Sequence, residues 1–208
     1  MKPVSVFSPR VAPYVIGCPE PLIQQAVVDS AIQFCEDSMA IRQKLDVFLT
    51  TVGSAAYELD TPTDQRVTRI FRVWVGDQLA HPMTAATAVP IGATPAPPIR
   101  YSTTRTDSTL ELQLFPPPDR AYAITVEVAL CPVRGAKSMQ DDLFNLWVDP
   151  VCYGAIGQLM QVPGQAFSDP TQGAGMVARA IQLSRKAKSE ATIGRVQTST
   201  SITSRAFA

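Results

Sequence analysis

The hydrophobic residues of this chain recur with a helical period near both ends and with a strand period in the middle. Residues 21–39 and residues 139–188 carry apolar side chains at three- and four-residue steps, which is typical of helices with one packed face. Between them, several short segments alternate apolar and polar positions, as half-buried strands do. The pattern predicts helices at the two ends and β-structure between them.

The first predicted helix has a distinct start. An acid followed by proline, at Glu20 and Pro21, suits the first turn of a helix, where the dipole favours negative charge and no backbone N–H is needed. The apolar stripe that follows is formed by Ile23, Val27, Ala31 and Phe34.

Four segments in the middle of the chain predict strands. Gly76 and Asp77 offer a tight turn after the second segment, which predicts a hairpin. Three prolines at residues 116–118 predict a stiff loop, because proline neither donates to a strand ladder nor continues a helix. The packed sides are expected to carry Ile41, Leu45, Val47 and Leu49; Val67, Phe71, Val73 and Val75; Leu110, Leu112 and Leu114; and Tyr122, Ile124, Val126, Val128 and Leu130.

The second helical stretch leaves one alternative open. Pro150 interrupts its apolar stripe, so either a new helix starts at residues 149–150 or the proline kinks one long helix. Asp169 followed by Pro170 predicts the capped start of a last helix. The polar side of that helix is either a solvated surface or a basic interface, and it carries Arg179, Arg185, Lys186 and Lys188.

Two segments contain few large apolar residues. Residues 84–98 are rich in Ala, Thr and Pro and predict a long surface loop. Residues 191–208 are rich in Ser and Thr and predict an extended C-terminal tail that does not fold alone.

These elements predict an α+β fold with a helical core and an inserted β-rich antiparallel domain. The core would comprise residues 1–40 and 139–190, and the insertion would comprise residues 41–138. The tail would follow the last helix. At 208 residues, the chain is long enough for one well-buried core with such an insertion.

Charge and hydropathy narrow the classes of partner. Lys and Arg number 18, as do Asp and Glu, so no net field draws the whole protein to DNA or to an acidic membrane. No window approaches the roughly 20 apolar residues of a membrane span. We therefore expect a protein made and kept in a cytoplasm, whose surface, rich in Thr, Ser, Gln, Ala and Pro, suits protein contacts.

The inventory of reactive residues is small. Cys18, Cys35, Cys131 and Cys152 contain no C-x-x-C pair, and with the one histidine, His81, they favour buried thiols over a zinc site or a Cys-His catalytic pair.

Two other motifs have ordinary explanations. Asp141 and Asp142 suit a helix N-terminus better than a metal site. The glycines at residues 173 and 175 lack the strand and the Gly-Lys of a phosphate-binding loop. We expect no enzymatic activity, no cofactor and no metal.

Several segments together carry a resemblance to a known family. They are residues 11–15 (VAPYV), 18–23 (CPEPLI), 31–35 (AIQFC), 57–60 (YELD), 70–79 (IFRVWVGDQL), and the second half from residue 109 to residue 188. In combination they resemble the head-to-tail adaptor of tailed bacteriophages, also called a connector, tail tubular or head-completion protein. The loop at residues 84–98 and the tail lie outside the resemblance.

The resemblance implies a structural virion protein at the neck, assembled in the host cytoplasm. Such proteins form a ring, usually of twelve copies, under the portal protein, extend the DNA channel and offer a platform to the tail tube or nozzle protein. DNA would pass through the lumen without specific recognition. The candidate portal-binding residues are those of the tail, Arg195, Ile202, Arg205 and Phe207, and the basic helix face is a second candidate interface.

Two other functions remain open at this stage. A more distal neck or tail-completion protein would bind a tail terminus and leave the portal alone. A β-rich carbohydrate- or protein-binding module would use the strand-rich middle, although Trp74 and Trp147 lie in apolar patterns that predict core positions.

Overall fold

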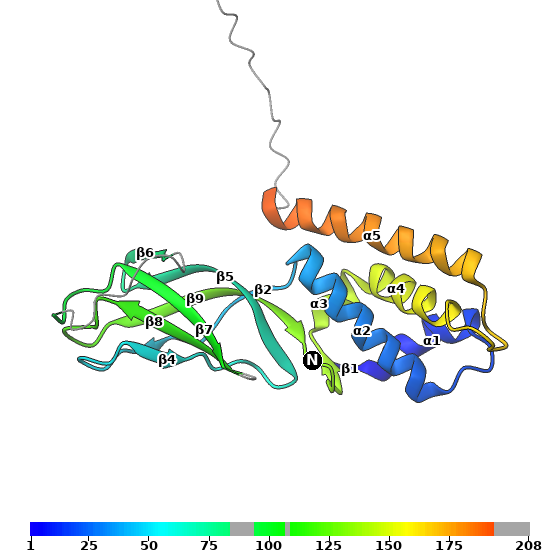
Figure 1. Cartoon of the computed structure of the whole chain (residues 1–208), viewed down its shortest axis with the longest axis horizontal. Coiled ribbons are helices and arrows are strands. Elements are labelled where there is room, and N and C mark those ends of the chain that lie inside the picture. The colour runs from blue at the N-terminus through cyan, green and yellow to red at the C-terminus, as the bar shows by residue number, and fades with distance from the viewer. Residues whose placement is uncertain (84–93, 107–108, 194–208) are drawn as a thin grey trace, which may run out of the picture.

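The computed structural model describes residues 1–83, 94–106 and 109–193. The molecule is elongated, with a curled sheet at one end and the helices at the other (Figure 1). Of the described residues, 40% are helical and 28% lie in strands.

In the part of the chain that the structure describes, the helical end is built from five α-helices. The chain enters through two short 3-10 turns, Val4–Phe7 and Ala12–Tyr14, on either side of α1. Helix α2 then runs past the sheet end, and α4 and α5 pack against it. Their bounds are α1 Ser8–Val11, α2 Glu20–Ser38, α3 Asp141–Asn145, α4 Val148–Met160 and α5 Pro170–Ile193.

Eight strands form one sheet, and two further short strands pair at the N-terminus. The order along the sheet is β2-β9-β5-β6-β7-β8-β4, and β3 also pairs with β9. All pairs are antiparallel except β6 with β7. The strands are β1 Lys2–Pro3, β2 Arg42–Lys44, β3 Phe48–Leu49, β4 Ala56–Glu58, β5 Gln65–Val75, β6 Gln78–Pro82, β7 Arg100–Thr106, β8 Thr109–Phe115, β9 Ala123–Pro132 and β10 Ser138–Met139.

The predicted helical core with an inserted antiparallel β domain is wrong. The fold is mixed α/β, and the large curled eight-stranded sheet dominates it. Periodicity predicted strands but not their partners: β2, β3 and β5 all pair with β9, and the parallel pair of β6 and β7 breaks the antiparallel pattern.

Strand β9 joins the sheet to the helices. Along its first half only one face is buried, so Ile124 and Val126 are inaccessible while Thr125 is half-buried. From Val128 to Pro132 every residue is buried, because α2 also contacts this end of the strand. One continuous cluster of buried residues therefore extends from the helices into the sheet.

The strand predicted from Ile41 to Leu49 is two short strands instead. The chain leaves the sheet between β2 and β3, so Leu45 is buried while Val47 and Leu49 are 61% and 69% exposed. In β5, the pairing with β9 is irregular between Val67 and Arg69 and between residues 70 and 72. These irregularities shift the alternation of inward and outward side chains. Single inserted residues of this kind turn the following side chains to the other face of a sheet.

The structure resolves the alternative at Pro150. Helix α3 ends at Asn145, and a new helix, α4, begins at Val148 with the proline in its first turn. The predicted start of α2 at Glu20 is confirmed. The cap of α5 is confirmed as well, because Asp169 Oδ1 accepts a hydrogen bond of 2.9 Å from the backbone N–H of Gln172.

Small residues let α2, α4 and α5 approach closely. The side of α5 that faces α2 and α4 buries Gly173, Ala180, Ser184 and Ala187. Gly154 of α4 leaves room for Ser30 of α2, whose hydroxyl donates a 2.7 Å hydrogen bond to the Val151 carbonyl.

Substitution of Gly154 by alanine tests this close packing. The new Cβ would lie 2.1 Å from Ser30 Oγ, so the serine must move and its buried hydrogen bond is lost. We expect Gly154→Ala to lower the free energy of unfolding by about 1–3 kcal/mol in denaturant titrations.

Gly175→Ala is the matched control. A Cβ at Gly175 meets nothing within 4 Å, and the residue is exposed within α5. Alanine there should raise the free energy of unfolding by up to about 1 kcal/mol, because it lowers the cost of ordering the helix. Equal effects of the two substitutions would contradict the packing described.

Candidate functional site

The basic residues predicted for the last helix lie at exposed positions of α5. Its small residues Ala180, Ser184 and Ala187 are buried against α2 and α4, which leaves the intervening positions in solvent. In Figure 1, α5 crosses one side of the helical end, with α4 and α2 on its inner side. The structure thus brings Arg179, Arg185, Lys186 and Lys188 together on one exposed helix.

The four basic side chains differ in their partners. The Arg179 guanidinium lies 5.0 Å from the centre of the Tyr153 ring on α4. Lys186 Nζ lies 3.9 Å from a carboxylate oxygen of Glu190. Within the described part of the chain, Arg185 and Lys188 form no ion pair. The face can therefore receive an acidic partner surface at little cost in broken contacts.

The other predicted portal-binding residues cannot be placed. Arg195, Ile202, Arg205 and Phe207 lie outside the described residues, as does most of the predicted loop at 84–98. Of that loop, residues 94–98 are described and lie outside any strand, with Pro98 buried.

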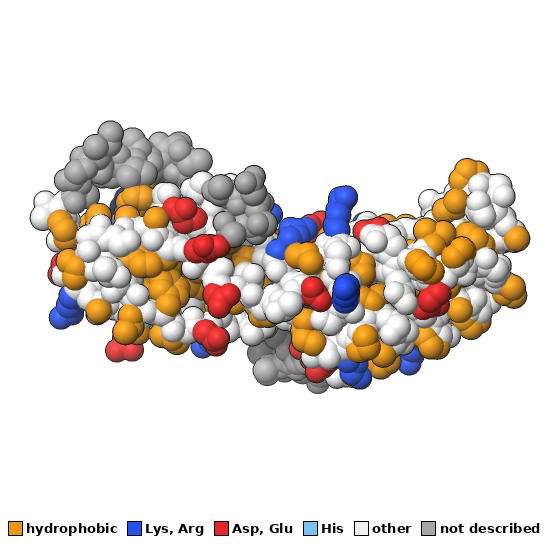
Figure 2. Space-filling view, turned by 90° about the horizontal axis from the view of Figure 1, so that it is seen from below, with side chains coloured by type: hydrophobic (Ala, Val, Ile, Leu, Met, Phe, Trp, Pro, Cys, Tyr) orange, Lys and Arg blue, Asp and Glu red, His pale blue; other side chains and the backbone are white. Residues whose placement is uncertain are grey.

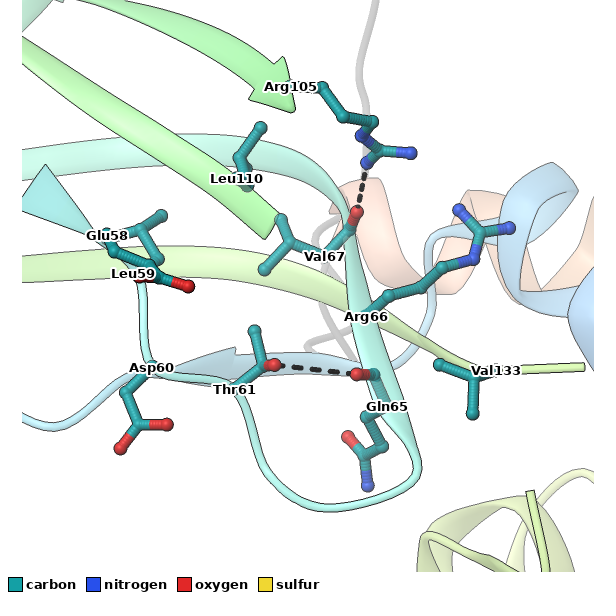
Figure 3. A pocket seen from close by; sticks show the side chains of 10 residues that line it. All are labelled: Glu58, Leu59, Asp60, Thr61, Gln65, Arg66, Val67, Arg105, Leu110 and Val133. Carbon is teal, nitrogen blue, oxygen red and sulfur yellow. Dashed lines mark hydrogen bonds between the residues drawn. The ribbon is translucent and has the colours of Figure 1, made fainter. Parts of the chain in front are cut away.

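A cavity of about 640 Å³ opens on the side of the sheet that adjoins the helices (Figure 3). It lies between the end of β4, the start of β5, and the adjoining ends of β7 and β8. Its lining residues are Glu58, Leu59, Asp60, Thr61, Gln65, Arg66, Val67, Arg105, Leu110 and Val133.

Internal contacts engage both arginines of this cavity. Arg105 donates a 2.6 Å hydrogen bond to the Val67 carbonyl across the open side of the sheet. Arg66 pairs with Glu36 of α2. The carboxylate of Asp60 points away from both guanidinium groups in Figure 3. The lining offers polar contacts, so it can bind a polar segment. It contains neither a thiol nor an imidazole, and therefore offers no nucleophile-base pair made of these two groups.

Sequence reasoning missed this cavity. Its residues come from β4, β5, β7 and β8 and from the segments that follow β4 and β9, and the sequence does not reveal how these strands pair. The arginines of β5 gave no signal for this site, because Arg66 lines the cavity whereas Arg69 and Arg72 do not.

The cysteines are buried or half-buried, whereas the one histidine is exposed. Cys35, Cys131 and Cys152 are buried, as predicted, and Cys18 is half-buried. Burial raises the pKa of the Cys131 thiol to about 11 and that of Cys152 to about 12, and it raises the pKa of Cys35 strongly. These thiols are protonated at neutral pH and therefore weak nucleophiles. His81 is exposed on β6.

The remaining motifs have structural roles. Asp141 lies in the first turn of α3 and receives the N-terminal amine of Met1 at 3.1 Å. Gly173 lies inside α5, where its backbone approaches Gly157 of α4. In residues 1–83, 94–106 and 109–193, no group of three or more His, Cys, Asp and Glu could hold a metal ion. In the same residues, no helix has the length and apolarity needed to cross a membrane.

Comparison with known proteins gives no assignment. No model of a protein family matches the chain, and no curated protein matches it significantly.

Thiol accessibility provides a direct test of the burial described here. In native protein, a maleimide should modify Cys18 alone, slowly at neutral pH and faster as the pH rises, because burial raises the pKa of this thiol. All four thiols should react after unfolding. Cys18→Ser should remove the native reaction, and rapid native labelling of that variant would contradict the burial of the other three.

Proposed function

We propose that this protein is a structural component of a tailed-bacteriophage virion, a head-to-tail adaptor. In this proposal, copies of the chain form a ring, usually of twelve, that docks on the portal protein and offers its far side to the tail tube or nozzle protein. The DNA channel continues through the ring, and no step of catalysis is required.

The observation that carries the proposal is the outer face of α5. Four cations lie at exposed positions of α5, on both flanks of the buried stripe that packs closely against α2 and α4, and Arg185 and Lys188 share one of these flanks. A rigid basic helix of this kind suits docking onto an acidic protein surface. The resemblance at residues 11–35 and 109–188 supplies the identity of that partner, since the resembling proteins dock on portals.

Two further features support an adaptor. The molecule is elongated, with helices at one end and a sheet at the other, so its two ends can engage two different partners (Figure 1). The formal net charge is zero, which suits a channel wall that must not retain passing DNA.

A binding measurement with the portal ring encoded in the same genome tests the proposal. We expect the protein to bind the portal, and Arg185→Glu with Lys188→Glu to weaken binding about tenfold or more, since two charge-assisted contacts become repulsive. Arg134→Glu with Lys137→Glu is the matched control, because these exposed cations lie outside α5 and carry the same charge change.

The outcomes separate the proposal from its nearest rival. Portal binding that is equally reduced by both double variants would remove α5 from the interface. Binding to an isolated tail terminus, with none to the portal, would assign the protein to a more distal neck or tail-completion position. The tail residues Arg195, Ile202, Arg205 and Phe207 remain a predicted second portal contact, tested by deleting the chain after Gly194.

A further inference from the structure

The outer face of the sheet carries a concentrated positive charge. Strands β2 and β5 flank β9, and their outward residues lie in two rows across it. Arg42 and Arg69 both pair in register with Ala129, and Lys44 and Arg72 both pair with Glu127.

We call this surface the basic face. It comprises Arg42 and Lys44 of β2 and Arg69 and Arg72 of β5, with the carboxylate of Glu127 between Lys44 and Arg72, so four cations less one carboxylate leave +3. The chain as a whole has no net charge, so this face represents a marked separation of charge.

Two aromatic rings lie beneath these cations. The Arg42 and Arg69 guanidinium groups lie 4.0 Å and 5.9 Å from the centre of the Phe71 ring, which the irregularity in β5 turns outward. Lys44 Nζ lies 5.1 Å from the Trp74 ring. The rings hold the cations in fixed positions, and because the cations cover them, they are poorly placed to stack on nucleic-acid bases.

A complementary acidic surface lies on the far strands of the same sheet. Glu58 of β4 and Glu111 of β8 are direct neighbours in register, a like-charge arrangement that destabilises a strand pair. Asp60 is exposed just beyond β4. We call these three residues the acidic face. Within the described residues, none of them forms an ion pair.

The two faces belong to different parts of the sheet. Strands β2, β9 and β5 stand at one end of the strand order, and β8 and β4 stand at the other. Figure 2 views the molecule from the side of β4, and Asp and Glu prevail over Lys and Arg on the sheet half of that view. Because the faces are separate, a single chain cannot pair them internally.

We propose that the basic face of one copy docks against the acidic face of a second copy. A contact between two different patches of the same chain is heterologous and repeats from copy to copy, which closes into a ring or extends as a filament. The like-charge pair Glu58 and Glu111 is relieved in this contact, and the cations of the neighbour supply the missing partners. The inference rests on the proposed function in that it supplies the lateral contact of the proposed ring.

Charge reversal provides the test, by sedimentation velocity of the full-length protein without a portal. Wild type should associate at high concentration, and less so as added salt screens the charges. Arg69→Glu with Arg72→Glu makes both faces acidic, and Glu58→Lys with Glu111→Lys makes both basic. Each double variant alone should lose association by roughly a hundredfold.

An equimolar mixture of the two variants should associate as wild type does. One variant's acidic surfaces then meet the other's basic surfaces at every junction. The matched control, Glu20→Lys with Asp29→Lys on α2, carries the same charge change away from both faces and should leave association unchanged. Thermal unfolding of each variant verifies that it is folded.

Three results would overturn the inference: a wild type that stays monomeric at low salt, variants that associate as wild type does, or a mixture that stays monomeric. Binding of a short single-stranded oligonucleotide that only the Arg69/Arg72 variant loses, without self-association, would reassign the basic face to nucleic acid. Because the portal is absent, failure here is distinguishable from failure of the proposed function, which is measured by portal binding.

Discussion

Burial of the end of β9 on both faces is the constraint on which the rest of the structure depends. A strand of a curled sheet needs only one apolar face, and β9 begins in that way, with Ile124 and Val126 inward. At Leu130 and Cys131 the second face is covered as well, because α2 and α3 contribute Cys35 and Leu143 to the same core. The sheet and the helices are therefore held by one core, and neither can be removed without exposing the other.

This coupling has a consequence for the proposed role in assembly. Helix α5 packs on α2 and α4, α2 packs on β9, and β9 pairs with β2, β3 and β5. The basic outer side of α5 and the outer face of the sheet are thus fixed relative to one another. In the proposed assembly, one surface contacts a neighbouring copy and another contacts a different protein. Such a chain needs two surfaces whose relative orientation is fixed.

The sequence predicts the elements well where one face is packed. The stripe of Ile23, Val27 and Ala31 predicts α2, and the alternation around Leu112 and Val126 predicts β8 and β9. The prediction fails where the exposure of a side chain depends on which strands pair and on irregularities in their pairing. The break between β2 and β3 exposes Val47 and Leu49, and the bulges of β5 turn Phe71 outward, because a shift of one residue exchanges the two faces.

The candidate sites also differ in how well the sequence predicts them. Exposed positions of a helix can be predicted from spacing, and Arg179, Arg185 and Lys188 are exposed on α5. Arg185 and Lys188 lie on one flank of its buried stripe, and Arg179 lies on the other. The basic and acidic faces of the sheet cannot be read in this way, since Arg42 meets Arg69, and Glu58 meets Glu111, only through long-range strand pairing. Because the net charge of the chain is zero, this separation of charge becomes evident only when the strand order is known.

The most direct test of the central claim is the mass of the complexes formed as the folded protein is titrated onto the portal ring of the same genome. An adaptor predicts saturation at one copy for each portal subunit. Absence of any complex, with the protein folded and intact, would contradict the account.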